Sequence, residues 1–83
     1  MKGFLYFLIP QKDNMNVVIN SENGGSYNII IVDMMGKIMR SEKVVANQGV
    51  NSYQYIIANL PSGNYILSAQ NNNGSQKVIF TVR

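Results

Sequence analysis

Apolar residues occur in short runs along the 83-residue chain, and within several runs every second position is apolar. Met15, Val17 and Ile19 follow this period, and Val78 and Phe80 follow it near the C-terminal end. Successive side chains of a β-strand leave opposite faces of the sheet, so each run has one face for a core and one for solvent. The pattern predicts strands.

Clusters rich in Asn, Gly, Pro and Asp separate the apolar runs, and these residue types favour tight turns. Short strands joined by turns at such spacing are typical of an all-β sandwich or barrel, and short connections imply antiparallel order. We expect six or seven strands and no helix. The turn clusters are residues 10–14, 23–25, 33–36, 47–49, 61–64 and 71–74.

Two segments depart from simple alternation. Residues 27–32 are apolar on both faces after Asn28, which predicts a central strand, or one whose outer face meets a neighbour or another domain. Residues 37–46 are also compatible with a helix. Because Asp33 and Gly36 just before them suit a type I turn that closes a hairpin, we predict a strand there.

The apolar positions in phase with these strands define the expected core. Each lies on the face of its run that carries most of the apolar side chains. The expected core residues are Val17, Ile19, Ile29, Ile31, Ile38, Tyr55, Ile57, Leu60, Tyr65, Leu67, Val78 and Phe80.

The length of the chain allows one domain. We expect residues 10–83 to form a single sandwich and residues 1–9 to be a lead-in or a first strand. The beginning resembles a signal peptide, with Lys2 before an apolar run. That run is only six residues long before Pro10, far short of the roughly 20 that a membrane span requires. We therefore expect no targeting segment and no integral membrane segment.

Charge is sparse and scattered. Charged residues make up 13% of the chain, about half of the usual share, and twelve Asn and five Gln supply polarity instead. The net charge is +3, but the seven cations do not form the dense stripe, interleaved with aromatic residues, that nucleic-acid binding requires. A nucleic-acid partner is not expected.

Candidate catalytic chemistry is almost absent. The chain has no His and no Cys, and its only carboxylates are Asp13, Glu22, Asp33 and Glu42. Catalysis near neutral pH requires groups that titrate or attack, and zinc sites are built from His and Cys. The four acids are not spaced as a calcium loop either. We predict no catalytic residue, no cofactor and no metal site, and hence no enzyme.

Two tyrosines invite a second interpretation. Tyr53 and Tyr55 lie two residues apart on one face of a predicted strand. They are suited either to a stacking platform for carbohydrate or to one side of the core, and the core is the more common role of such a pair.

Two motifs and the last strand carry a family resemblance. Residues 33–37 read D-x-x-G-K, residues 59–65 read N-L-x-S-G-x-Y, and residues 77–83 form a strand with cations at both ends. In this order, over roughly residues 10–83, they resemble the C-terminal sorting domain of the type IX secretion system of Bacteroidetes. Physically, Gly suits turn backbone that a Cβ disfavours, and Pro presets a turn. The motif residues are Asp33, Gly36, Lys37, Pro61, Gly63 and Tyr65.

The resemblance implies an immunoglobulin-like antiparallel β-sandwich of about seven short strands. It also implies a non-catalytic signal that directs an attached upstream cargo across the outer membrane to the cell surface, with the periplasm as the route of transit. The implied partners are the outer-membrane secretion machinery and a sortase-like peptidase, of which the domain is the substrate. Lys77 and Arg83, on the polar face of the last strand, are the candidate recognition residues.

Two alternatives remain at this stage. One is an accessory immunoglobulin-like interaction module of a secreted enzyme or adhesin. The other is the carbohydrate-binding module suggested by Tyr53 and Tyr55.

Overall fold

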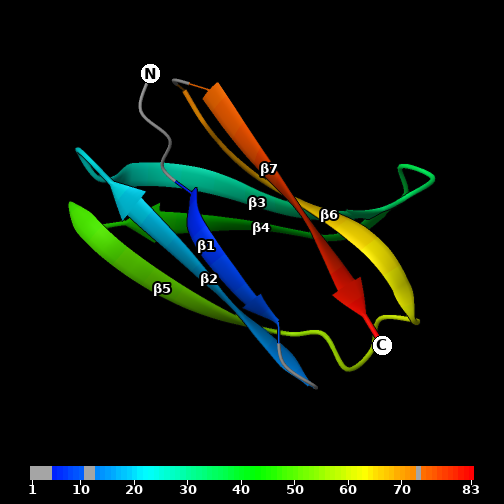
Figure 1. Cartoon of the computed structure of the whole chain (residues 1–83). Helices are drawn as coiled ribbons and strands as arrows, with labels where there is room; N and C mark the ends of the chain where they lie inside the picture. The colour runs from blue at the N-terminus through cyan, green and yellow to red at the C-terminus, as the bar shows by residue number, and fades with distance from the viewer. Residues whose placement is uncertain (1–4, 11–12, 73) are drawn as a thin grey trace.

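The computed structural model of the chain describes residues 5–10, 13–72 and 74–83, and these form seven strands and no helix. All pairings are antiparallel, in a three-stranded sheet of order β1-β2-β5 and a four-stranded sheet of order β4-β3-β6-β7 (Figure 1). The strands are β1 (Leu5–Pro10), β2 (Asn14–Ser21), β3 (Gly25–Asp33), β4 (Ile38–Ala46), β5 (Gly49–Ile56), β6 (Gly63–Asn71) and β7 (Gly74–Val82).

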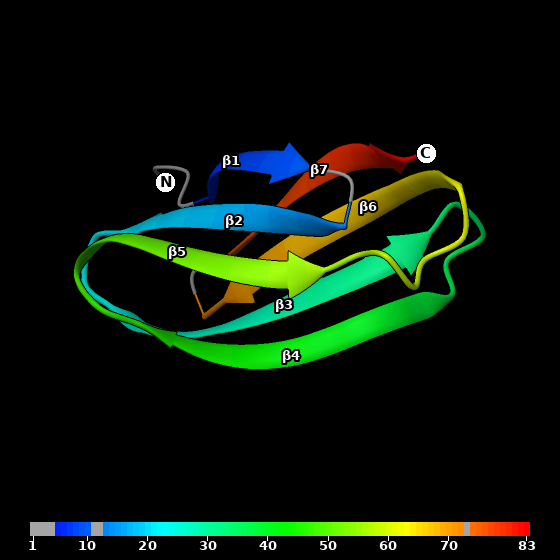
Figure 2. The same ribbon diagram turned by 90° about the horizontal axis from the view of Figure 1, so that it is seen from below.

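The two sheets face each other as layers (Figure 2). The immunoglobulin constant-type arrangement places its fourth strand in the sheet of the first two strands. Here β4 instead lies beside β3, in the sheet that contains β6 and β7. The prediction of an immunoglobulin-like antiparallel sandwich of about seven strands is confirmed. The ambiguous segment 37–46 forms strand β4.

The N-terminal region is described from Leu5 onward. Residues 5–10 form β1, which pairs with β2 along the edge of the three-stranded sheet. The expectation for residues 1–9 is a lead-in or a first strand, and residues 5–9 of this segment lie in β1. Residues 1–4 lie outside the described residues, as do residues 11–12 of the first predicted turn and residue 73 of the last.

The core lies between the sheets and follows the predicted alternation. Met15, Val17, Ile19 and Leu67 have no exposed surface. Of the twelve residues predicted for the core, ten are buried, and two are not. Val78 is only partly buried, whereas Phe80 and Val82 on the same face of the edge strand β7 are buried.

Ile38 is the second exception, and a β-bulge explains it. Ile31 pairs with Arg40, but the next residue, Val32, pairs with Ile38, so Met39 is an extra residue on β4. A shift of one residue moves side chains to the opposite face of a sheet. Ile38 is therefore 59% exposed, and Met39 packs against the core in its place. The prediction that Ile38 is a core residue is wrong.

Candidate functional site

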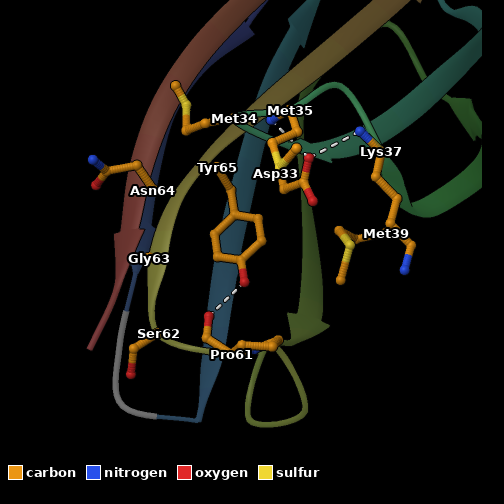
Figure 3. A pocket seen from close by; sticks show the side chains of 10 residues that line it. All are labelled: Asp33, Met34, Met35, Lys37, Met39, Pro61, Ser62, Gly63, Asn64 and Tyr65. Atoms are coloured by element: carbon orange, nitrogen blue, oxygen red, sulfur yellow. Dashed lines mark hydrogen bonds between the residues drawn. The ribbon is translucent and has the colours of Figure 1, made fainter.

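The pairing of β3 with β6 brings the two sequence motifs together. Asp33, the first residue of the D-x-x-G-K motif, pairs directly with Tyr65, the last residue of the second motif. The two turns line an open groove of about 450 Å³ at one end of the four-stranded sheet (Figure 3). Asp33, Met34, Met35, Lys37 and Met39 line one side, and residues 61–65 line the other.

Asp33 organises the first turn through its carboxylate. The backbone N–H groups of Met35 and Lys37 both donate to Asp33 Oδ1, at 2.9 Å each. The N–H of Gly36 donates to the Asp33 carbonyl at 3.0 Å, and the Asp33 N–H donates to the Lys37 carbonyl at 3.0 Å. Gly36 has a φ of +89°, a left-handed value that favours glycine. The motif therefore encodes a hydrogen-bonded turn.

Tyr65 organises the second turn. The residue is 4% exposed, and its ring stacks on Phe80 with ring centroids 5.7 Å apart. Its hydroxyl donates to the carbonyl of Pro61, four residues upstream (Figure 3). A tyrosine near the start of the sixth strand that bonds back to the preceding corner is the tyrosine corner of immunoglobulin-like sandwiches. This bond fixes the corner between β5 and β6 against the core, and Gly63 opens the strand with a φ of +152°.

The candidate recognition residues lie outside the groove. Lys77 is exposed and pairs with Ser68 in the middle of the four-stranded sheet. Arg83 is exposed and follows Val82, which pairs with Gly63 at the end of the sheet that carries the groove. Six residues of strand separate the two cations by about 20 Å. The structure does not bring them together into one site.

Five groove residues were not among the motif residues singled out from the sequence, and three of them are methionines. Met34, Met35 and Met39 line one side, and Met35 is 94% exposed. Methionine is flexible and polarisable, which suits adaptable contact surfaces. The sequence shows these methionines in and just after the first turn, which is the signal that could have pointed to them. Only the folded chain places them beside residues 61–65. Thr81 Oγ1 also donates to Asn64 Oδ1 at 2.8 Å, which links the second motif to β7.

The groove offers contact chemistry and no proton-transfer machinery. Its carboxylate, on Asp33, already accepts two backbone hydrogen bonds, and the phenol of Tyr65 donates to a backbone carbonyl. Lys37 contributes an ammonium group at the exposed rim. In the part of the chain that the structure describes, no helix has the length and apolar character needed to cross a membrane.

The proposed carbohydrate platform does not form. Tyr55 is 6% exposed and belongs to the core, and Tyr53 is partly buried against it. The Tyr53 hydroxyl donates to the Val45 carbonyl at 3.3 Å, across the gap between β5 and β4. The interpretation of the pair as one side of the core is confirmed, and the stacking platform is wrong.

Tyr55 carries a buried hydroxyl that has no hydrogen-bond partner among the described residues. Burial, followed by the nearby Glu42 carboxylate and Tyr53, raises the pKa of Tyr55 from 10.0 to about 12. The fold thus favours the neutral phenol. The unfolded chain therefore ionises first: the free energy of unfolding is unaffected by ionisation of this group below pH 10 and falls as the pH rises through about 12.

We expect Tyr55→Phe to raise the free energy of unfolding at pH 7 by about 1 kcal/mol, because it removes a buried polar group without a partner. The variant should also lose less stability than the wild type between pH 10 and 12. Urea denaturation at pH 7, 10 and 12 measures both effects. A destabilisation of the variant at pH 7 would show that the hydroxyl is hydrogen-bonded in solution.

Comparison with known protein families identifies the domain. The family described as the secretion system C-terminal sorting domain matches residues 9–81. The chain belongs to this family. The match runs from the end of β1 almost to the end of β7 and includes both turn motifs. No curated protein sequence matches the chain.

The sorting-domain family gives the function. The domain is a C-terminal sorting signal for type IX secretion in Bacteroidetes, with the cell surface as the destination of the family. Such a domain is a secretion signal rather than a catalytic unit, it is attached to an upstream cargo, and it interacts with the type IX machinery. Export therefore proceeds through the type IX system.

Proposed function

We propose that this sorting domain is recognised in the periplasm, as a folded sandwich, by the outer-membrane components of the type IX machinery. The attached cargo then crosses to the cell surface, and a sortase-like peptidase removes the domain, which is the substrate of that step. The family match over residues 9–81 carries the proposal. The groove supports it, because its polar groups are engaged in holding turns rather than poised for reaction.

Within this proposal the motif residues act by building the label. Asp33 and Gly36 shape one turn, and Tyr65 holds the Pro61 corner. Lys37 and Gly63 complete the same end of the sandwich. Lys77 and Arg83 are exposed, and we propose that a partner recognises the label through these two cations.

The test is a reporter fusion that uses the full 83-residue chain. A reporter with its own export signal carries the chain at its C-terminus in a type IX-competent Bacteroidetes host and in an isogenic strain that lacks the system. We expect the reporter to be accessible to external protease only in the competent host, and to be separated there from the sorting domain. The same reporter without the domain should stay in the periplasm of both strains.

A Leu67→Asp fusion is the folding control, because Leu67 is fully buried and a charge there prevents folding. If the wild-type fusion reaches the surface and the Leu67→Asp fusion does not, the folded sandwich is the signal. Retention of the intact, folded wild-type fusion in the periplasm of the competent host would overturn the proposal and favour an accessory interaction module. A surface reporter still joined to the domain would overturn the peptidase step only.

A further inference from the structure

The outer face of the four-stranded sheet carries an apolar row that crosses every strand of that sheet. Ile38 of β4 pairs with Val32 of β3, Val32 pairs with Ile66 of β6, and Ile66 pairs with Ile79 of β7. Directly paired residues lie on the same face of a sheet. The four side chains therefore form one continuous row on the face opposite to the core.

This row is open to solvent at both ends. Ile38 is 59% exposed and Ile79 is 64% exposed, while Val32 and Ile66 in the centre are partly exposed. The solvent face of an antiparallel sheet is normally polar, and contiguous apolar patches with a polar rim mark interaction sites. The two-sided apolar pattern of residues 27–32 belongs to β3, which is a central strand as predicted, and Val32 of this strand contributes to the row.

The charges around the row have one sign. Within the described strands of this four-stranded sheet, two charged side chains lie on the outer face. They are Lys43, which pairs with Asn28, and Lys77, which pairs with Ser68. Arg83 follows directly after β7. Glu42 has the opposite phase on β4, since its partner is the buried Ile29. Lys77 lies two residues from Ile79 of the row, and Arg83 lies four residues on its other side. Lys43 is farther away, five residues from Ile38 along β4, so the charges of this face are all positive but only Lys77 lies close to the row.

This arrangement selects the occupant. A second copy of the chain stacked on the same face would place Lys43 and Lys77 among like charges, which is unfavourable in an interface. A partner with an apolar strip and acidic flanks would match both features of the face. We infer that the row Ile38–Val32–Ile66–Ile79 is the docking surface of the sorting domain for an acidic protein surface of the secretion machinery. The inference rests on the proposed function, and it names the surface that the machinery reads.

The test compares two pairs of equally exposed apolar residues in the same reporter fusion. The double variant Ile38→Gln/Ile79→Gln removes both ends of the row. The matched control, Val50→Gln/Ile56→Gln, changes residues that are 65% and 59% exposed on β5 of the other sheet. We expect surface delivery to fall by about tenfold or more in the first variant, the loss expected from two interface residues, and to stay unchanged in the control.

The charges are tested in the same way. Lys77→Glu should lower delivery, and Lys77→Arg should preserve it. Thermal unfolding of each purified variant is the control for folding. We expect the fold to persist, because all of the substituted side chains are exposed. Normal delivery of Ile38→Gln/Ile79→Gln beside a delivered wild type would overturn the inference and leave the proposed function intact. Absence of wild-type delivery would overturn both.

The oligomeric state of the purified chain tests whether a second copy covers the apolar row. Sedimentation of the purified wild-type chain should show a monomer. A dimer that Ile38→Gln/Ile79→Gln dissociates would show that a second copy covers the face, and would overturn the inference of an acidic partner.

Discussion

Replacement of Tyr65 by alanine is expected to lower the free energy of unfolding by about 3–5 kcal/mol, the usual cost of truncating a buried aromatic residue. Tyr65 is almost fully buried, stacks on Phe80 and donates its hydroxyl to the Pro61 carbonyl. A domain of this size has a stability of only about 4–12 kcal/mol. The variant should therefore be partly unfolded near physiological temperature.

Tyr65→Phe separates the ring from the hydroxyl. It keeps the stack on Phe80 and loses only the corner bond, so we expect a cost of about 0.5–1.5 kcal/mol. The control is Tyr53→Phe, which loses a longer bond of 3.3 Å to the carbonyl of the exposed Val45 and should cost less. Urea denaturation measures the change in the free energy of unfolding for all three variants, on condition that the slope of this free energy with urea concentration is the same as in the wild type. A Tyr65→Ala variant as stable as Tyr65→Phe would contradict the role of the ring in the core.

The second large effect is expected at the other turn. Asp33→Ala removes the acceptor of the Met35 and Lys37 N–H groups and leaves both without their protein partner. Because the turn is exposed and water replaces part of the loss, we expect a cost of about 1–2 kcal/mol. For a domain of this length, that corresponds to a decrease in Tm of roughly 4–8 °C per kcal/mol.

Asp33→Asn is the matched variant. Its side-chain oxygen can accept the same two hydrogen bonds without the charge, so we expect it to recover most of the lost stability. Thermal unfolding followed by circular dichroism compares the two. If Asn cost as much as Ala, the charge of Asp33 rather than its position as an acceptor would support the turn.

The turn also shapes the outer face of the sheet. The bulge at Met39, just after the D-x-x-G-K turn, places Ile38 opposite Val32 rather than on the core side. On the neighbouring strand, Ile66 follows Tyr65 directly and takes the next position of the row. The two central residues of the row thus each lie next to a motif residue, since Val32 precedes Asp33 and Ile66 follows Tyr65.

The local part of this fold could be predicted from the sequence. The alternation at Met15–Ile19 and Val78–Val82 reflects side chains that point to opposite faces of an extended chain. Asp33 and Gly36 predict a tight turn because the carboxylate and the missing Cβ act within a few residues of the chain. The lack of His and Cys in the composition is enough to exclude most catalytic and zinc chemistry. Such signals are local or compositional, and the sequence by itself carries them.

Only the tertiary structure decided which elements meet. The face of Ile38 depends on a bulge that no alternation reveals, since the pairing with β3 sets the register of β4. Tyr55 gave no signal of its unpartnered hydroxyl, because that depends on what packs around it. The groove and the apolar row join residues more than 25 positions apart, such as Asp33 with Tyr65 and Val32 with Ile66. Cross-strand pairing is a non-local contact, so their position became visible only when the strands were placed side by side.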